Sequence, residues 1–231
     1  MRIRSFIVAY ALLLAILLFA DRRHSAVVED RYSHVVDLTD AQNGAGQTGG
    51  AAQTQSARPE TRIIAPDSLI PGTWTAGQIP PERLIAPLVV MDLNVAPPAQ
   101  ISLDDIADWE TKHGAVPQGA VVAIRRPAGS TQSSSRLPIT TDAAQFLMDA
   151  RYSIGFVVNS SADLNADHTL ARQLALHGDY VVEDTAAMTT LPATGSLIIV
   201  APAKPALAAK LAPAMGKTLQ AAPVRVLAMV R

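Results

Sequence analysis

RPETRIIAPDSLIPGTWTAGQIPPER, residues 58–83, is the most distinctive stretch of this 231-residue chain. It is dense in prolines and carries Trp74, one of only two tryptophans. Proline fixes φ and has no N–H to donate, so we expect neither a long regular helix nor a central strand here. A proline-rich loop of low charge with a large aromatic is more often packed and functional than a flexible linker. We therefore predict an ordered loop with a structural or binding role.

Composition narrows the classes of protein to consider. Hydrophobic residues make up 49% of the chain but aromatic residues only 4%, so the core is expected to be aliphatic. The length fits one medium domain or at most two small ones. The formal net charge is −1, and no long basic run provides an electrostatic footprint for nucleic acid. The chain has no cysteine, which excludes disulfides, zinc–thiolate sites and cysteine nucleophiles.

The N-terminus has the layout of an export signal. Arg2 and Arg4 precede an uncharged apolar run, residues 6–20, and Asp21 follows at once. This is typical of a secretory signal peptide or a short signal anchor at residues 1–20, followed by a linker at 21–32. The run is shorter than the ~20 residues that span a bilayer comfortably, and its end fits the small-x-small cleavage rule poorly. We predict an exported protein, either periplasmic or tethered to the outer face of the cytoplasmic membrane through residues 6–20. A buried N-terminal helix is less favoured, because the run is apolar on every face.

Apolar runs alternate with helical patterns along the rest of the chain. The apolar runs predict strands at 33–39, 88–93, 119–124, 154–158, 180–183, 197–201 and 224–229. Helices are predicted at 101–113, capped by Ser102 and closed by His113 and Gly114, at 141–150, capped by Thr141, and at 168–177. Such alternation indicates one α/β domain, residues 33–231, with a mixed and largely covered sheet.

Three segments are predicted to lie outside the regular elements. Residues 40–57 are rich in Gly, Ala, Gln, Thr and Ser and predict a flexible loop, without a phosphate-binding glycine motif. Residues 126–138 predict a second loop. Residues 204–219 predict an exposed insertion.

Several stretches, taken together, point to one family. They are VVDLT (35–39), APDSLIPGTWTAGQIPPERLIAPLVVMDL (65–93), ISLDDIADWETKHGAVPQGAVVAIR (101–125), GDYVVED (178–184), GSLIIVAPAK (195–204) and PVRVLAM (223–229). In this order they resemble the cyclase family of metal-dependent hydrolases, which includes bacterial kynurenine formamidase. The resemblance implies an α/β fold around a central mixed, barrel-like β-sheet flanked by helices. It also implies assembly as dimers or tetramers.

The family's chemistry is not preserved in the residues. Active members carry a His-x-Gly-Thr-His-x-Asp-x-Pro-x-His pattern whose His and Asp side chains hold a divalent metal, commonly zinc. Such a metal lowers the pKa of a bound water so that it attacks an amide or ester carbonyl. The corresponding positions here are Arg58, Glu60, Thr61, Arg62, Ile64, Pro66 and Ser68, of which only Thr61 and Pro66 match, and Asp40 replaces a His after the first strand. Arginine is always cationic and isoleucine has no donor atom, so the pattern predicts no metal site there.

Two later residues keep a catalytic alternative open. Glu183 stands where the family has a glutamate, while the family's late histidine falls on Ala171. His168 lies one helical turn before Ala171 on the same face, so a relocated catalytic pair, His168 and Glu183, is geometrically conceivable. Asp163 and Asp167 could add to a new metal site with them, although a surface helix start at His168 is the more favoured interpretation.

Three functions follow as hypotheses. The first is a non-catalytic, exported domain that binds a ligand or partner, with Arg58, Arg62 and Trp74 as candidate ligand-binding residues. Because guanidinium groups bind carboxylates in pairs of hydrogen bonds, one hypothesis is a small anionic ligand, and the other is that both arginines point into solvent. No metal and no other cofactor is expected, whereas the family metal would be zinc or manganese. The alternative is a metal-dependent amidohydrolase of the arylformamidase type with the relocated site. The third is a purely structural domain that forms homo-oligomers.

Overall fold

The computed structural model describes residues 32–39, 60–93, 100–126, 137–160, 164, 168–202 and 221–231. Contacts divide the chain into a unit of residues Met1–His34 with Arg231 and a unit of residues Val35–Val230. The fold described here is that of the second unit. The predictions for residues 1–31, for the loops at 40–57 and 126–138 and for the insertion at 204–219 fall wholly or mostly outside the described residues.

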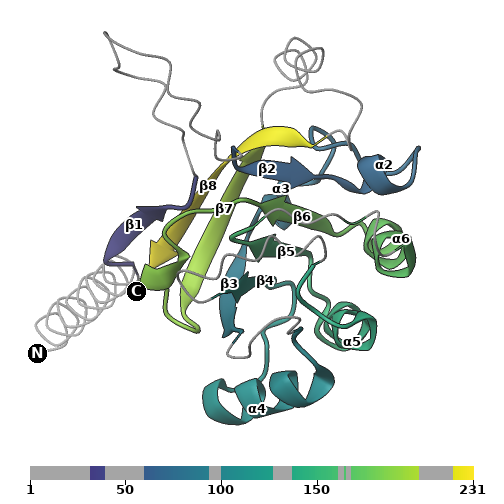
Figure 1. Cartoon of the computed structure of the whole chain (residues 1–231). Coiled ribbons are helices and arrows are strands. Elements are labelled where there is room, and N and C mark those ends of the chain that lie inside the picture. Colours follow the sequence, from purple (N-terminus) through teal and green to yellow (C-terminus); the bar gives the residue numbers. More distant parts are fainter. Residues whose placement is uncertain are drawn as a thin grey trace, which may run out of the picture. The chain divides into compact units, whose positions relative to one another are not determined.

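A closed barrel forms the centre of the fold (Figure 1). Eight described strands pair in the order β1-β8-β2-β6-β5-β4-β3-β7, and an additional β7–β8 pairing closes the ring. Strand β1 pairs outside this ring, so the remaining seven strands make the barrel. The strands are β1 His34–Asp37, β2 Arg62–Ile64, β3 Ile85–Asp92, β4 Val121–Arg125, β5 Gly155–Val158, β6 Tyr180–Glu183, β7 Ser196–Pro202 and β8 Ala222–Val230. The predicted central mixed, barrel-like sheet is confirmed.

Strand direction determines which residues meet at each end of the barrel. Strands β3, β4, β5 and β6 run parallel, so their carboxyl ends share one end of the barrel. Strand β2 runs antiparallel to β6, which brings its first residue, Arg62, to that same end. Strands β7 and β8 are antiparallel to each other and close the ring against β3 and β2.

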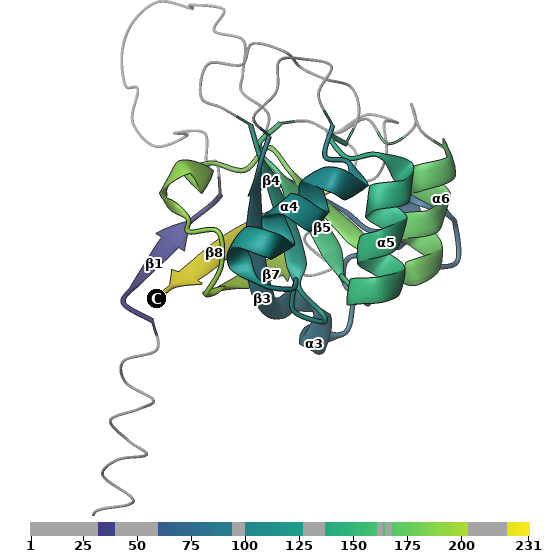
Figure 2. The same ribbon diagram turned by 90° about the horizontal axis from the view of Figure 1, so that it is seen from below.

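Three longer helices connect the parallel strands and lie outside them (Figures 1 and 2). They are α4 Leu103–His113, α5 Thr141–Arg151 and α6 His168–His177, as predicted within two residues. Ser102 caps α4 and forms a reciprocal capping box with Asp105. The predicted cap of α5 was wrong: the side chain of Thr140, not that of Thr141, accepts the hydrogen bond from the Ala143 amide. Thr141 is already the first helical residue.

Side chains alternate between two apolar cores. On neighbouring strands, Ile63 and Val182 point into the barrel, where an aliphatic cluster fills the interior. Their sequence neighbours Ile64 and Val181 point outward into a second cluster between the barrel and the helices. The indole of Trp109 on α4 donates a hydrogen bond to the Val90 carbonyl at 3.0 Å and ties this helix to β3. The expected aliphatic core is therefore divided by the barrel wall.

The proline-rich stretch is more regular than the sequence predicts. Strand β2 pairs on both sides, with β6 and with β8, so the prediction that no central strand occurs here was wrong. The strand is only three residues long and its flanking prolines lie outside it, so no ladder hydrogen bond is lost to them. Two one-turn helices follow, α2 Pro66–Leu69 and α3 Pro81–Leu84, and each has a proline in its first turn. Proline is favoured there, because the first amides of a helix have no partner within it.

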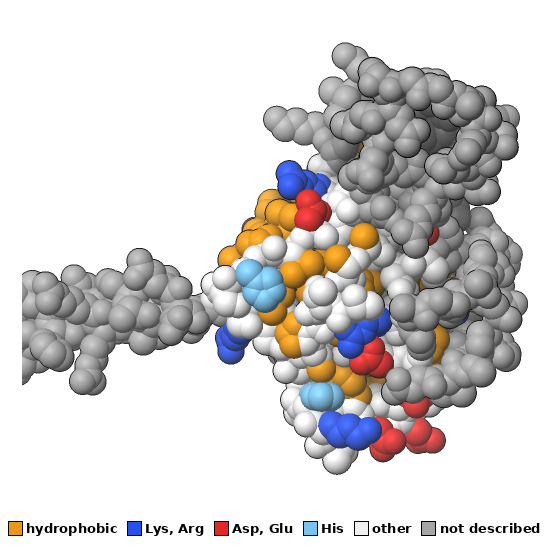
Figure 3. Space-filling view, turned by 60° about the vertical axis from the view of Figure 1, so that its left-hand side comes forward, with side chains coloured by type: hydrophobic (Ala, Val, Ile, Leu, Met, Phe, Trp, Pro, Cys, Tyr) orange, Lys and Arg blue, Asp and Glu red, His pale blue; other side chains and the backbone are white. Residues whose placement is uncertain are grey.

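The helices cover only part of the barrel. The outward side of β7 and β8 carries no helix among the described residues, and Figure 3 shows hydrophobic side chains gathered on the face that β1, β7 and β8 present. The sequence predicted a largely covered sheet from the alternation of helical patterns with apolar strands, and the three longer helices of the described residues connect only the parallel strands β3 to β6. No helix in the described part of the chain is long and apolar enough to cross a bilayer.

Candidate functional site at the carboxyl end of the barrel

The central feature of the site is an ion pair between neighbouring strands. Arg62 at the start of β2 lies directly opposite Glu183 at the end of β6. Both point away from the barrel interior, since their alternate neighbours Ile64 and Val181 belong to the outer core. Nη2 of Arg62 lies 2.8 Å from Oε1 of Glu183 and 3.7 Å from Oδ2 of Asp184. One guanidinium is thus held between two adjacent carboxylates.

The acidic side of this pair is shielded from water. The side chains of Glu183 and Asp184 are only 5% and 7% exposed, whereas that of Arg62 is 31% exposed. Charge-assisted hydrogen bonds with one shielded partner are stronger than fully exposed ion pairs, which contribute about 1 kcal/mol or less. Among the described residues, Nε of Arg62 is buried without a hydrogen-bond partner. The guanidinium therefore has one buried donor to spare.

The backbone around the acids is tightly fixed. Asp184 has a left-handed conformation with φ 56°, which is uncommon for a non-glycine residue. The Thr61 hydroxyl donates to the Asp184 carbonyl at 2.7 Å, and the Asp184 amide donates to the Ser160 carbonyl at 3.3 Å. Thr61 itself is fully buried. The residue before β2 and a loop residue after β5 together hold the turn in which the second carboxylate lies.

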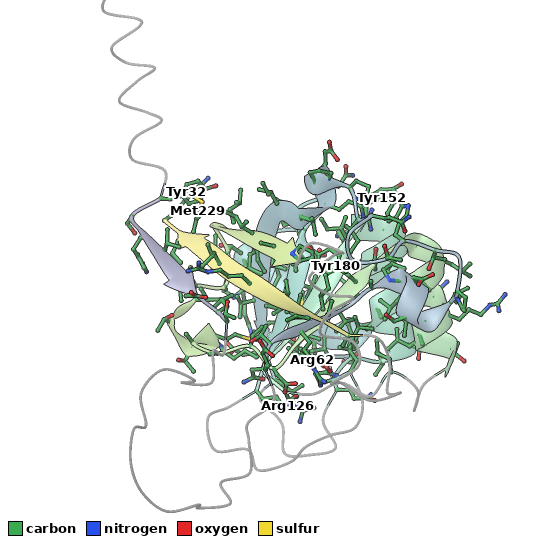
Figure 4. All side chains as sticks on the ribbon, turned by 90° about the horizontal axis from the view of Figure 1, so that it is seen from above. Tyr32, Arg62, Arg126, Tyr152, Tyr180 and Met229 are labelled. Atoms are coloured by element: carbon green, nitrogen blue, oxygen red, sulfur yellow. The ribbon has the colours of Figure 1, made fainter. Side chains whose placement is uncertain are left out.

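A second arginine follows the parallel strand β4, which β5 separates from β6. Arg126 is 6% exposed, and burial lowers the pKa of its guanidinium. Its amide donates to Oδ1 of Asn159 at 3.3 Å, and Nδ2 of Asn159 donates to the Arg126 carbonyl at 3.4 Å. Figure 4 shows Arg62 and Arg126 at the same end of the barrel. Two arginines and two carboxylates leave the described site without net charge.

These residues do not fit a divalent metal. Arg62 stands where the motif has its second histidine, and its guanidinium is already paired with Glu183. Ile64 and Ala171, at two other ligand positions, are buried in the same apolar core. Ser68 lies within the short helix α2. No cluster of three or more His, Cys, Asp or Glu side chains suitable for a metal occurs in the described part of the chain.

The structure does not bring all the predicted site residues together. Arg62 and Glu183 meet, but Trp74 lies at the other end of β6, where its ring covers Gly178. Five residues of extended chain separate Gly178 from Glu183, or about 16 Å. His168 begins α6, but its side chain and the whole of Arg58 fall outside the described parts. The catalytic role predicted for His168 and Glu183 and the ligand-binding role of Arg58, Arg62 and Trp74 stay predictions.

Trp74 belongs to a different polar cluster, at the amino end of β6. Arg83 packs 5.6 Å from the Trp74 ring centroid and donates to the Gly178 carbonyl at 3.1 Å and to Oδ1 of Asp179 at 2.8 Å. Asp179 is 1% exposed, and its Oδ2 has no hydrogen-bond partner among the described residues. Burial raises the pKa of Asp179 to about 8, although the Arg83 charge acts in the opposite direction.

Sequence reasoning missed Asp184, Arg126 and the Arg83–Asp179 pair. Asp184 directly follows Glu183 and could have been included as a second acid of the same turn. Nothing local distinguishes Arg126 or Arg83 from surface arginines, because their burial depends on the packing of distant strands. The pairing of Asp179 depends on a helix turn ninety-six positions earlier in the chain.

Comparisons with known proteins agree with this architecture. A family model described as "Putative cyclase" matches residues 51–162, so the predicted family resemblance is confirmed. Isatin hydrolase A from Labrenzia aggregata, solved with benzyl benzoate bound, has a TM-score of 0.63 at 22% identity, covering 91% of this chain and 98% of that one. Isatin hydrolase A from Ralstonia solanacearum has a TM-score of 0.62 at 20% identity, covering 92% and 97%.

A third solved structure, of a potential metal-dependent hydrolase with cyclase activity, has a TM-score of 0.57 at 22% identity and covers 86% of this chain and 98% of that one. At these identities the likeness establishes the fold and not the activity. A search of curated proteins found no match.

Proposed function

Because the chain has the fold of the cyclase-family hydrolases while its described residues do not fit that family's metal, we propose that it is a non-catalytic protein that binds a ligand or a partner. The observation that carries this proposal is the Arg62–Glu183 ion pair at 2.8 Å. A guanidinium cannot lose its proton in a protein and has no lone pair for a metal. It supplies positive charge to Glu183 and Asp184 but no activated water.

The loss of metal chemistry is supported by packing as well as by charge. Ile64 is 1% exposed and Ala171 is 8% exposed, and both contribute to the core beneath the helices. Reintroducing polar ligands at these two positions would remove apolar burial and leave donor atoms in a dry environment. Of the positions where the family has metal ligands, Arg62 thus carries a positive charge, and Ile64 and Ala171 belong to the apolar core.

The ligand that best suits this end of the barrel is a small carboxylate. The side chain of Arg62 is 31% exposed, and Arg58 lies four residues before it in the sequence. A carboxylate ligand would compete with Glu183 for the guanidinium, and such exchange is favourable only where further cations contribute. The candidates are Arg58, which is close in the sequence, and Arg126, which follows β4 at the same end of the barrel.

The rival proposal is a metal-dependent amidohydrolase of the arylformamidase type that uses His168 and Glu183. It requires Glu183 to release Arg62 and bind a metal, and no described residue favours that exchange. The proposal of export rests on the N-terminal pattern alone. An alkaline-phosphatase fusion after Arg31 would be active if residues 32–231 lie outside the cytoplasm, and an inactive fusion would contradict export.

Metal analysis of the purified full chain is the decisive experiment. We expect zinc and manganese well below one equivalent per chain, and no hydrolysis of an aryl formamide above the buffer rate. Stoichiometric metal together with hydrolysis would refute the non-catalytic proposal. If hydrolysis occurs, Glu183→Gln and His168→Ala test the rival site, which fails if both variants keep full activity.

Carboxylate binding is tested separately by thermal shift with a panel of small mono- and dicarboxylates. We expect a stabilising compound whose effect is lost in Arg62→Lys, because lysine cannot offer two parallel donors. The matched control is Arg151→Lys, which alters another arginine paired with a glutamate, at 2.7 Å, between helices α5 and α4. Equal shifts in both variants would contradict a ligand site at Arg62.

A further inference from the structure

Two residues that contact the turn of Glu183 and Asp184 each have a buried polar atom without a hydrogen-bond partner among the described residues. These atoms are Nε of Arg62 and Oγ of Ser160. Arg62 contacts both acids through Nη2, and the Ser160 carbonyl accepts a hydrogen bond from the Asp184 amide at 3.3 Å. Buried polar groups are hydrogen-bonded in most proteins, so two such atoms beside one charged turn point to a polar ligand there.

The charges of this turn constrain what such a ligand can carry. A carboxylate that binds Arg62 competes with Glu183 and Asp184 for one guanidinium. It adds a negative charge beside two shielded carboxylates and draws away a cation that both of them contact. Charges that are shielded from water interact strongly, so this exchange is unfavourable for a ligand that carries negative charge alone. A cationic group on the same ligand restores the balance.

We propose that this site binds a zwitterion, a small molecule that carries both a carboxylate and a protonated amine. The carboxylate binds the guanidinium of Arg62, and the amine takes the place of that guanidinium beside Glu183 and Asp184. The new ion pairs replace the contacts that are lost, at 2.8 Å to Glu183 and 3.7 Å to Asp184, and the net charge of the site stays the same. The inference rests on the proposed ligand-binding function and adds that the ligand itself supplies the further cation.

The donors and acceptors of the site suit both ends of a zwitterion. A protonated amine has three N–H donors. Glu183 and Asp184 offer carboxylate oxygens, and the buried hydroxyl of Ser160, in the loop after β5, is a third acceptor. On Arg62, Nε and Nη2 form one edge of the guanidinium and present two parallel donors. Nε is the one without a partner among the described residues, so the release of Nη2 from Glu183 completes a fork for a carboxylate.

A length-matched trio of compounds tests the proposal, namely γ-aminobutyrate, butyrate and butylamine, which share one unbranched carbon chain. Binding to the purified full chain is measured by isothermal titration calorimetry at neutral pH and low salt. We expect the zwitterion to bind about tenfold more tightly, or better, than either compound with a single charge, because each of those leaves one shielded charge without its replacement. Shorter and longer ω-amino carboxylates, each with its matching carboxylate and amine, then determine the separation of the two charges that binds best.

Asp184→Asn tests which group recognises the amine. Asparagine is among the residues that most readily adopt a left-handed backbone, so the variant retains the turn at φ 56° while it loses one charge. The preference for the zwitterion over the carboxylate should fall to about threefold or less, and butyrate should bind more tightly, because one competitor for Arg62 is gone. The matched control is Asp149→Asn, since Oδ1 of Asp149 on α5 lies 3.3 Å from Nε2 of His177 and the residue is not part of the site. Circular dichroism checks the folding of both variants.

The outcomes distinguish failure of this inference from failure of the proposed carboxylate site. If each carboxylate binds as tightly as its amino counterpart, the zwitterion is refuted, while a carboxylate site at Arg62 stands. If each amine alone binds as tightly as the zwitterion, both are refuted, because the acids then bind a cation without help from Arg62. A preference that Asp184→Asn leaves unchanged would overturn the inference, and so would the absence of binding throughout the series. If Asp184→Asn misfolds, the comparison of the three compounds on the unaltered chain still decides.

Discussion

Strand β6 has an arginine–carboxylate pair at each end, and the two pairs are embedded differently. At the amino end, Arg83 lies 2.8 Å from Asp179, and it also donates to main-chain carbonyls and stacks on Trp74. At the carboxyl end, Arg62 lies 2.8 Å from Glu183, and its second described contact is with another acid, Asp184. The first arginine is shared between backbone, aromatic and acid, whereas the second is held by acids.

This difference distinguishes Arg83, which connects several parts of the fold, from Arg62, which belongs to a candidate binding site. Removing Arg83 would loosen the Trp74 loop, a helix end and the start of β6 at once. Removing Arg62 would take one partner from each of two carboxylates and would break no contact to a loop among the described residues. A ligand can compete for a guanidinium held by side-chain acids, while a guanidinium bound to main-chain carbonyls is committed to the fold. The comparison predicts that the stability of the fold depends mainly on the pair at the amino end of β6, and ligand binding on the pair at its carboxyl end.

Arg83→Ala should have the largest effect. It removes charge-assisted hydrogen bonds to the Gly178 carbonyl and to Asp179 and the contact with Trp74, so we expect a loss of about 3 kcal/mol in the free energy of unfolding. Urea unfolding at pH 6 and at pH 9 measures it. The loss should be greater at pH 9, because Asp179 is then ionised beside Arg83 in the intact protein, and the variant loses this attraction between opposite charges. If Arg83→Ala lost less stability than Arg62→Ala, the carboxyl end of β6 would contribute more to stability than the amino end, which would contradict the comparison.

Gly178→Ala should follow with about 2 kcal/mol. The glycine has φ +72°, and a Cβ there would lie 2.9 Å from the Trp74 ring, so the variant is strained both by backbone conformation and by contact. The fluorescence of Trp74 should change together with the unfolding midpoint. Gly119→Ala is the matched control, because it has φ +71° but nothing within 4 Å of the added methyl. Equal losses in both would mean that the Trp74 contact contributes nothing.

Asp179 should give the amino end a distinct pH dependence. Its pKa is about 8 when folded and near 3.9 when unfolded, so between these values the folded state binds more protons. Stability from this group is therefore complete at low pH and falls as pH rises, by at most about 1.4 kcal/mol per pH unit. Asp179→Asn should remove that slope between pH 5 and pH 8. An unchanged slope in chemical unfolding would show that Asp179 is ionised throughout.

Arg62→Ala should have the smallest effect on stability, about 1 kcal/mol, because the arginine is itself 31% exposed, so its removal opens a path for water to the two acids that it shields. Arg62→Lys keeps the charge and should lose less. Both variants are measured by urea unfolding at neutral pH. A loss of about 3 kcal/mol or more from Arg62→Ala would mean that Arg62 stabilises the fold as Arg83 does. It would count against a ligand that displaces Glu183 from Arg62.

Sequence patterns identify most elements of the barrel but not their partners. Continuous apolar runs indicate β3 to β8, and Ser102 with Asp105 marks the start of α4. Strand β2 has only three residues, too few to give a periodic signal between prolines. The resemblance placed Arg62 and Glu183 in one site, yet their contact depends on the register of β2 against β6, which no local pattern specifies. For the same reason, an apolar strand such as β7 does not reveal which of its faces is covered.

The closing position of β8 has a consequence for the order in which the fold can form. Strand β8, residues 222–230, is the last of the described strands and supplies the partner for β7, β2 and β1. Until it has been synthesised, β2 and β7 each keep an unpaired edge, and β1 has no described strand to join. Barrel closure also links residues nearly two hundred positions apart, as in the Asp37–Arg225 contact. Long-range pairing of this kind slows folding, so the barrel stays unclosed through most of the synthesis of the chain.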